Sequence, residues 1–226
     1  MGLVHRPPLG CDPEGFLQMN RASFIVDGFN LYHSIVDIQR DLHICTKWLD
    51  IFSLCSSYLH FIGNNANLEY VFYFSALATH LNDPGVIQRH QNYMECLKAT
   101  GINCELSRFK PKNINCPNCN HVIVRHEEKE TDVAIAAKLF ELLHCNMCDT
   151  VVLVTGDTDI SPAVETCTNL FPLKNIIFAF PYKRKNKELA KLTHSFKISV
   201  QSYTKYQLPN PFPLPDGTTI SKPLSW

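Results

Sequence analysis

Four aspartates in this chain have positions that suit one shared chemical site. Each follows an apolar β-branched run or opens an apolar helical segment, and the four are Asp27, Asp132, Asp157 and Asp159. Carboxylates that share a site need a strong counter-charge. The usual counter-charge is a hard divalent cation such as Mg2+ or Mn2+, which prefers oxygen ligands. The pattern therefore predicts metal-assisted phosphoryl chemistry.

The elements that must position these acids alternate between strand and helix patterns. Strand patterns cover 23–27, 68–77, 102–109, 150–155, 175–180 and a short stretch at 197–200. Helix patterns lie between them at 30–38, 47–62, 83–101, 130–144, from Ser161 onward, and at 186–194. This order predicts an α/β fold, a three-layer sandwich with a mainly parallel central sheet. Ligands of such sheets bind beyond the carboxyl ends of the strands, where Asp27 and Asp157 fall.

Taken singly, each acidic segment has a simpler structural explanation. Asp132 suits the positive end of a helix dipole, Asp157 suits a turn or cap, and Asp27 followed by glycine is a common turn pair. The coincidence of all three segments at one predicted sheet edge favours a metal site over these separate explanations.

Length and composition describe one globular α/β domain with an insert and a tail. The chain has 226 residues, 45% of them hydrophobic and 19% charged, and its net charge is zero. No global field therefore attracts it to nucleic acid. We expect a leader at 1–22, the domain at 23–202 with an insert at 110–128, and a proline-rich tail at 203–226, either disordered or draped over the surface. No secretory or membrane-spanning pattern is present, so we expect a cytoplasmic protein.

The three acidic blocks together resemble the NYN domain family, a branch of the PIN-like nucleases. They read Asp27-Gly-Phe-Asn-Leu-Tyr32, Lys129-Glu-Thr-Asp-Val-Ala134 and Thr155-Gly-Asp-Thr-Asp159. The resemblance covers about residues 22–202 and implies one or two Mg2+ or Mn2+ ions and cleavage of RNA phosphodiesters. It makes the four aspartates the metal-binding, catalytic set. Asn30 matches a polar residue beside the first acid, Thr155 matches a hydroxyl residue before Gly-Asp, and the role of Glu130 stays open.

Basic residues leave or enter the same predicted edge in three groups. The groups are Arg108, Lys110 and Lys112; Arg125 and Lys129; and Lys183, Arg184, Lys185 and Lys187. Any one group could be an ordinary solvated charge run. Converging on one edge, they predict a track for the phosphates of single-stranded RNA. Phe109 and Tyr182 lie among them and could stack on bases.

The pair Cys116 and Cys119 has the spacing of a zinc knuckle. We expect one structural Zn2+ completed by Cys104 or by a nearby histidine such as His126. The alternative is a reduced-thiol hairpin without metal. The second pair, Cys145 and Cys148, is disfavoured because a helix roughly 21 Å long separates it from the insert.

The sequence thus predicts a metal-dependent, endonucleolytic ribonuclease. One rival is a catalytically silent RNA-binding or scaffold domain of the same fold. Another is a Mg2+-dependent small-molecule phosphatase, although Phe29 stands where one class of these needs a second aspartate. A dinucleotide-binding enzyme is disfavoured because the Gly-x-Gly-x-x-Gly pattern is missing. Zero net charge and the tail leave room for a protein partner or a homo-oligomer.

Overall fold

The computed structural model of the chain describes residues 19–77, 83–115, 119 and 122–226. In the two paired strands at 103–115 and 122–129, some residues are described by their backbone alone. These are residues 108, 111, 115 and 123–129. Within the described part, no helix combines the length and apolar character needed to cross a membrane.

One sheet of seven strands forms the centre of the described residues, in the order β4-β3-β2-β1-β5-β6-β7. The strands are β1 (Asn20–Asp27), β2 (Ala66–Ala76), β3 (Asn103–Asn115), β4 (Val122–Lys129), β5 (Thr150–Val154), β6 (Asn175–Phe180) and β7 (Ser195–Lys197). Six neighbouring strands of the sheet, β3-β2-β1-β5-β6-β7, are parallel, and β4 runs antiparallel to β3 at the edge. The predicted mainly parallel sheet is confirmed. Strand order reverses between β1 and β5, which makes their carboxyl ends a topological switch point.

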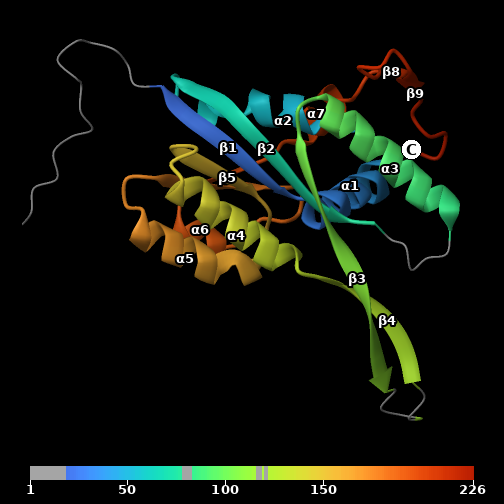
Figure 1. Ribbon diagram of the computed structural model, residues 1–226, viewed down its shortest axis with the longest axis horizontal. Coiled ribbons are helices and arrows are strands. Elements are labelled where there is room, and N and C mark those ends of the chain that lie inside the picture. Colours follow the sequence, from blue (N-terminus) through green and yellow to red (C-terminus); the bar gives the residue numbers. More distant parts are fainter. Residues whose placement is uncertain (1–18, 78–82, 116–118, 120–121) are drawn as a thin grey trace, which may run out of the picture.

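Helices cover both faces of the sheet and complete the predicted three layers (Figure 1). One face packs against α1 (Gly28–Leu42), α2 (Ile51–Ser57), α3 (Pro84–Ala99) and α7 (Val200–Lys205). The other packs against α4 (Thr131–His144), α5 (Ser161–Leu170) and α6 (Leu189–Leu192). Successive side chains of a strand point to opposite faces. Phe24 and Val26 of β1 accordingly enter the first core, and Ile25 enters the second.

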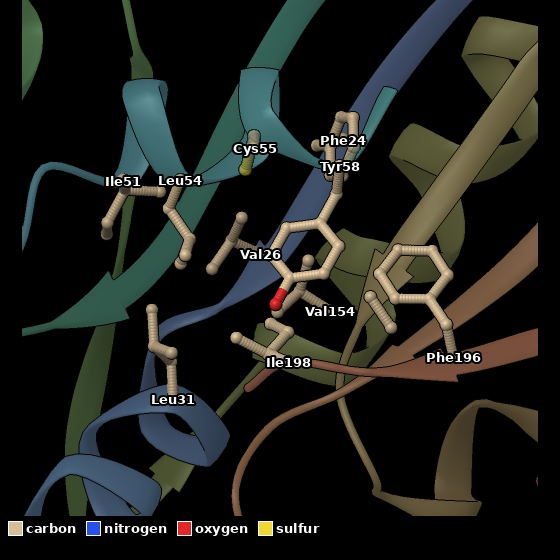
Figure 2. Close-up of a pocket in the computed structure, with 11 residues that line it drawn as sticks. Phe24, Val26, Leu31, Ile51, Leu54, Cys55, Tyr58, Val154, Phe196 and Ile198 are labelled. Carbon is tan, nitrogen blue, oxygen red and sulfur yellow. The ribbon is translucent and has the colours of Figure 1, made fainter. Parts of the chain in front are cut away.

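Figure 2 shows a small cavity in the first core, beneath α2 and beside Phe196. Its volume is about 10 Å³, and the surface that lines it is apolar. A buried water needs more than one polar partner, so this space is a packing gap and not a binding site.

The described residues of the predicted insert at 110–128 belong largely to two antiparallel strands, β3 and β4. We expected the third strand to end at Phe109, but β3 continues to Asn115 and pairs with β4 from Arg108↔Lys129 to Asn115↔Val122. The paired strands project beyond the body of the molecule (Figure 1). β3 pairs with β2 only as far as Ser107, and beyond that residue β4 is its one partner among the described strands. Proline, which lacks an N–H, is tolerated in such an edge region, and Pro111 lies there.

Residues after α7 lie packed against the first core. Leu208 and Phe212 are buried, and the Trp48 indole donates a hydrogen bond to the Pro209 carbonyl at 3.1 Å. Two short strands, β8 (Phe212–Pro213) and β9 (Thr219–Ile220), pair with each other. The expected alternative of a disordered tail does not apply to these residues, and α7 crosses the boundary that we placed at residue 202.

Candidate active site

The carboxyl ends of β1 and β5 bring the first and third acidic segments together. Asp27 ends β1 and caps α1, where its Oδ1 accepts a hydrogen bond from the Asn30 N–H at 3.0 Å. Thr155 follows β5, and its hydroxyl donates to Asp27 Oδ2 at 2.8 Å. Both side chains are buried. The contact arises because Val26 and Val154 are direct neighbours in the parallel ladder.

The loop after β5 is held by the side chains of Asn30 and Thr155, two residues to which the family resemblance points. Asn30 Oδ1 accepts a hydrogen bond from the Gly156 N–H at 2.9 Å. The Asp157 N–H donates to the Thr155 hydroxyl at 3.1 Å, and the Asp159 N–H donates to Asp157 Oδ1 at 3.1 Å. The loop then enters the short 3-10 helix η3 (Thr158–Ile160). Asn30 and Thr155 therefore fix the backbone that carries the two later acids.

Two of the four carboxylates, those of Asp27 and Asp132, have pKa values that the neighbouring acids raise. Burial raises the pKa of Asp27, the charge of Asp157 adds to the rise, and hydrogen bonds from Asn30 and Thr155 oppose it. Asp132 is exposed at the start of α4, yet partial desolvation of its carboxyl group raises its pKa. Three negative charges raise it further, those of Asp157, Asp27 and Asp159. The predicted convergence of the acidic segments on one edge fits this electrostatic coupling.

The donor set suits a hard divalent cation. All four side chains offer carboxylate oxygens, and the repulsion between them is relieved by a positive charge. Among the described residues, no three Asp, Glu, His or Cys side chains form a preassembled metal cluster. A metal site made of these four carboxylates therefore stays a prediction.

Two of the predicted phosphate-binding cations form ion pairs with α1. Lys183 Nζ lies 2.6 Å from Asp41 Oδ2, and Arg184 Nη2 lies 2.6 Å from Asp37 Oδ2. The same turn packs closely against the acidic loop at Gly156. The approach is so close that a Cβ on this glycine would lie 1.9 Å from the Arg184 carbonyl oxygen. Lys183 and Arg184 therefore attach the turn after β6 to α1 and to the site.

The other predicted cations lie around the same end of the sheet. Lys110 pairs with Glu130 across 2.6 Å at the junction of β4 and α4. Lys112 is exposed on β3, and Lys185 and Lys187 are exposed after β6. The side chains of Arg108, Arg125 and Lys129 lie outside the described residues. Their part in a phosphate track stays a prediction.

The structure does not support Cys104 as a partner of the Cys116–Cys119 pair. Cys104 lies at the start of β3, half-buried, and burial raises the pKa of its thiol to about 11. Cys119 is exposed beyond the far end of that strand, roughly 35 Å away at about 3.4 Å per residue. Cys104 is close to Cys119 in sequence, but the extended strand β3 between them keeps the two thiols apart. Cys116 and the His126 side chain lie outside the described residues, so a zinc site with those ligands stays a prediction.

A cavity beside the acidic site was not predicted. Its volume is about 510 Å³, and Gly28 and Phe29, the two residues after Asp27, form part of its wall. The other lining residues come from α1, from α2 and the segment before it, from α3, from the ends of β2 and of the C-terminal segment, and from Phe109 of β3. No local sequence pattern marks such a cavity, because each element supplies only a few of its residues.

Comparison with known proteins gives a family and a fold. The family model of the NYN domain matches residues 24–199. A Vibrio parahaemolyticus protein of unknown function has a similar crystal structure, with a TM-score of 0.52 at 17% identity over 84% of this chain and 97% of its own. Acinetobacter baumannii MurG matches 79% of this chain and 41% of its own at 7% identity, and its TM-score of 0.33 is too low to carry an argument. No curated protein is detectably similar in sequence.

Proposed function

Because the chain belongs to the NYN domain family, we propose that it is a metal-dependent ribonuclease that cleaves single-stranded RNA internally. The NYN domain has a PIN-like nuclease fold, and the proposed site lies at its central switch point. The observation that carries the proposal is the electrostatic coupling of Asp132 to the other three aspartates, which come from two different strand ends. Uncompensated carboxylates in one place are costly to folding, so their presence favours a cation-binding role.

In this proposal the four aspartates hold Mg2+ or Mn2+, with Asp27 as the most rigid of them. Its two oxygens already accept hydrogen bonds from the Asn30 N–H and the Thr155 hydroxyl, so its orientation is fixed before any ligand arrives. A bound divalent cation would supply positive charge beside the scissile phosphate and lower the pKa of a water molecule. Asn30 keeps the loop of Asp157 and Asp159 in place through the Gly156 N–H.

The chain's own cations would guide the RNA backbone to this edge. Lys112, Lys185 and Lys187 are exposed, and they come from β3 and from the segment after β6. Ion pairs between lysines and phosphates release counterions and depend on salt, without reading the sequence. We therefore expect RNA binding that weakens as salt rises, although the net charge of the chain is zero.

The test is cleavage of end-labelled single-stranded and hairpin RNAs with Mn2+, Mg2+ or EDTA. Asp157→Asn removes one proposed ligand charge, and we expect it to slow cleavage about 10²–10³-fold, as losing one preorganised electrostatic contact does. The matched control is Asp216→Asn, which makes the same charge change on the exposed turn between β8 and β9. It should cleave as the wild type does.

Cleavage that survives in Asp157→Asn would contradict the site assignment. Salt-sensitive RNA binding without cleavage in any metal would favour a silent RNA-binding domain. If the protein neither binds nor cleaves RNA, small phosphorylated substrates become the better explanation of the acidic site.

A further inference from the structure

The cavity beside the acidic site has the size and position of a binding pocket. Its volume of about 510 Å³ falls within the range of about 300–1,000 Å³ that is usual for small-molecule sites. It begins at Gly28, whose Cα is about 3.8 Å from that of Asp27 across one peptide bond. Figure 1 shows α1, α3, β3 and the C-terminal segment gathered on this side of the molecule. The cavity and the acidic site therefore share the first turn of α1.

Aromatic rings form much of the cavity wall. Phe29 and Phe109 meet edge to face with ring centroids 5.7 Å apart, and Tyr32 is 49% exposed. Elsewhere in the wall, Trp226 lies against Tyr93, with ring centroids 5.6 Å apart. Exposed aromatic faces favour flat, apolar ligands, and nucleobases stack on them whatever their sequence.

A few polar groups converge on the same space. His90 Nε2 lies 3.4 Å from the hydroxyl of buried Ser75, and burial lowers the pKa of His90. A lowered pKa favours the uncharged imidazole, in which one nitrogen donates and one accepts a hydrogen bond, and Nε2 already faces the Ser75 hydroxyl. Lys47 and Arg89 also line the cavity. No Asp or Glu does so among the described residues. Such a wall suits an uncharged, hydrogen-bonding ring that is linked to a negatively charged group.

We propose that this cavity is a base pocket, which takes one unstacked nucleobase from the RNA strand whose neighbouring phosphate lies at the acidic site. The position of the phosphate rests on the proposed ribonuclease function. The pocket itself rests on its aromatic wall, on the His90–Ser75 pair and on its continuity with Asp27. It would hold the strand in one register and give cleavage a preference for the base that it accepts.

The test measures base insertion by fluorescence in EDTA, so that no cleavage is needed. Short RNAs carry the fluorescent base 2-aminopurine, or an abasic residue, at one position at a time. We expect stacking to quench the fluorescence at one preferred position. Removing the base at that position should weaken binding about tenfold, in line with the usual contribution of one stacked base.

Two pocket variants and one control make the test specific. Val86→Phe places a larger side chain into the cavity from the first turn of α3, and Tyr32→Ala removes an exposed ring from α1. In both we expect the quenching to disappear and the abasic RNA to bind as it does to the wild type. The control Tyr70→Ala removes a ring of similar exposure, 36%, from β2 outside the cavity. It should behave as the wild type.

The outcomes separate this proposal from the proposed function. If both folded variants quench and bind base-containing RNA as the wild type does, the base pocket is overturned, while metal-dependent cleavage would still support the nuclease. Quenching that depends on Val86 and Tyr32 supports the base pocket even if no metal produces cleavage. Equal binding of abasic and base-containing RNA at every position overturns the base pocket alone.

Discussion

The Thr155 hydroxyl connects the two strand ends of the acidic site. It donates to Asp27 Oδ2 and accepts from the Asp157 N–H, so one oxygen sets the position of two acids from different segments. Both of its hydrogen-bonding roles are used inside a buried site, where a lost bond usually costs about 1–3 kcal/mol. The resemblance to the NYN family pointed to Thr155, but only the structure assigns its partners.

Stability without metal should fall as the site carboxylates ionise. The pKa values of Asp27 and Asp132 are raised in the folded protein. The folded state therefore holds these protons more tightly than the unfolded chain does. This contribution favours folding below the ordinary carboxyl pKa of about 3.9, and it is lost as the pH rises through the raised values. In EDTA we expect Asp132→Asn to melt a few degrees above the wild type at pH 7, with no advantage near pH 3.5.

Denaturation by heat or urea across this pH range measures the effect. Asp216→Asn is the opposite case, because hydrogen bonds from Thr218 lower the pKa of Asp216. Its carboxylate favours folding above the ordinary pKa, so this variant should gain nothing at pH 7. A wild type whose stability matches that of Asp132→Asn at every pH would contradict the electrostatic account of the site.

The elements with clear periodicity were predictable, and those shaped by long-range contacts were not. The strand at 175–180 and the helix at 130–144 appear as β6 and α4 almost to the residue. The basic helix expected at 186–194 shrinks to α6, since the segment before it forms a turn. Lys183, whose φ is 59°, lies in an earlier, separate turn before the expected helix. Its ion pair with α1 could not be foreseen from local sequence.

Gly156 should be irreplaceable where the loop after β5 meets that turn. In Gly156→Ala the new Cβ would lie 1.9 Å from the Arg184 carbonyl oxygen, a backbone atom that cannot rotate aside. We expect a loss of about 1–3 kcal/mol or more in the free energy of unfolding, as overpacking produces. Urea denaturation measures it.

Gly85→Ala is the matched control for that substitution. Its new Cβ would meet only two side-chain atoms, Asp83 Oδ1 at 3.1 Å and Arg89 Nη1 at 3.2 Å. Arg89 can turn away, and a shift of a few tenths of an ångström relieves the contact with Asp83 while it still caps α3. We expect little or no loss, because alanine also favours helix α3. Equal stability of the two variants would show that the loop and the turn are not packed together.

At the scale of the whole molecule, the C-terminal segment belongs to the first core. Residues 207–226 contribute buried Leu208 and Phe212, and the Trp48 indole binds the Pro209 carbonyl. Five prolines predicted a segment without regular helix, which fits its two short strands. Whether such a segment packs depends on partners far away in sequence. Sequence patterns therefore placed Asp27 and Asp157 after two parallel strands, as the structure has them, yet they could not reveal the tail's packing or the cavity.

Among the side chains of the tail, the buried ones should contribute stability and the exposed ones should not. Phe212 is 7% exposed, and Phe212→Ala should lower the free energy of unfolding by about 3 kcal/mol or more, as buried Phe→Ala changes usually do. Leu224 is fully exposed in the same segment, so Leu224→Ala should have almost no effect. Thermal or urea denaturation of the two variants measures both. Similar effects from both would mean that the segment is not anchored at Phe212.

The two tryptophans of the chain give it an optical signal of its own. Trp48 is buried in the first core, whereas Trp226 forms part of the wall of the base pocket. An indole in such a wall changes its emission when the adjacent space fills, while a buried indole keeps its surroundings. Their rings lie 6.0 Å apart, so the two emissions are also coupled. The unlabelled protein can thus report occupancy of the cavity by its intrinsic fluorescence, and a screen for ligands needs no modified RNA.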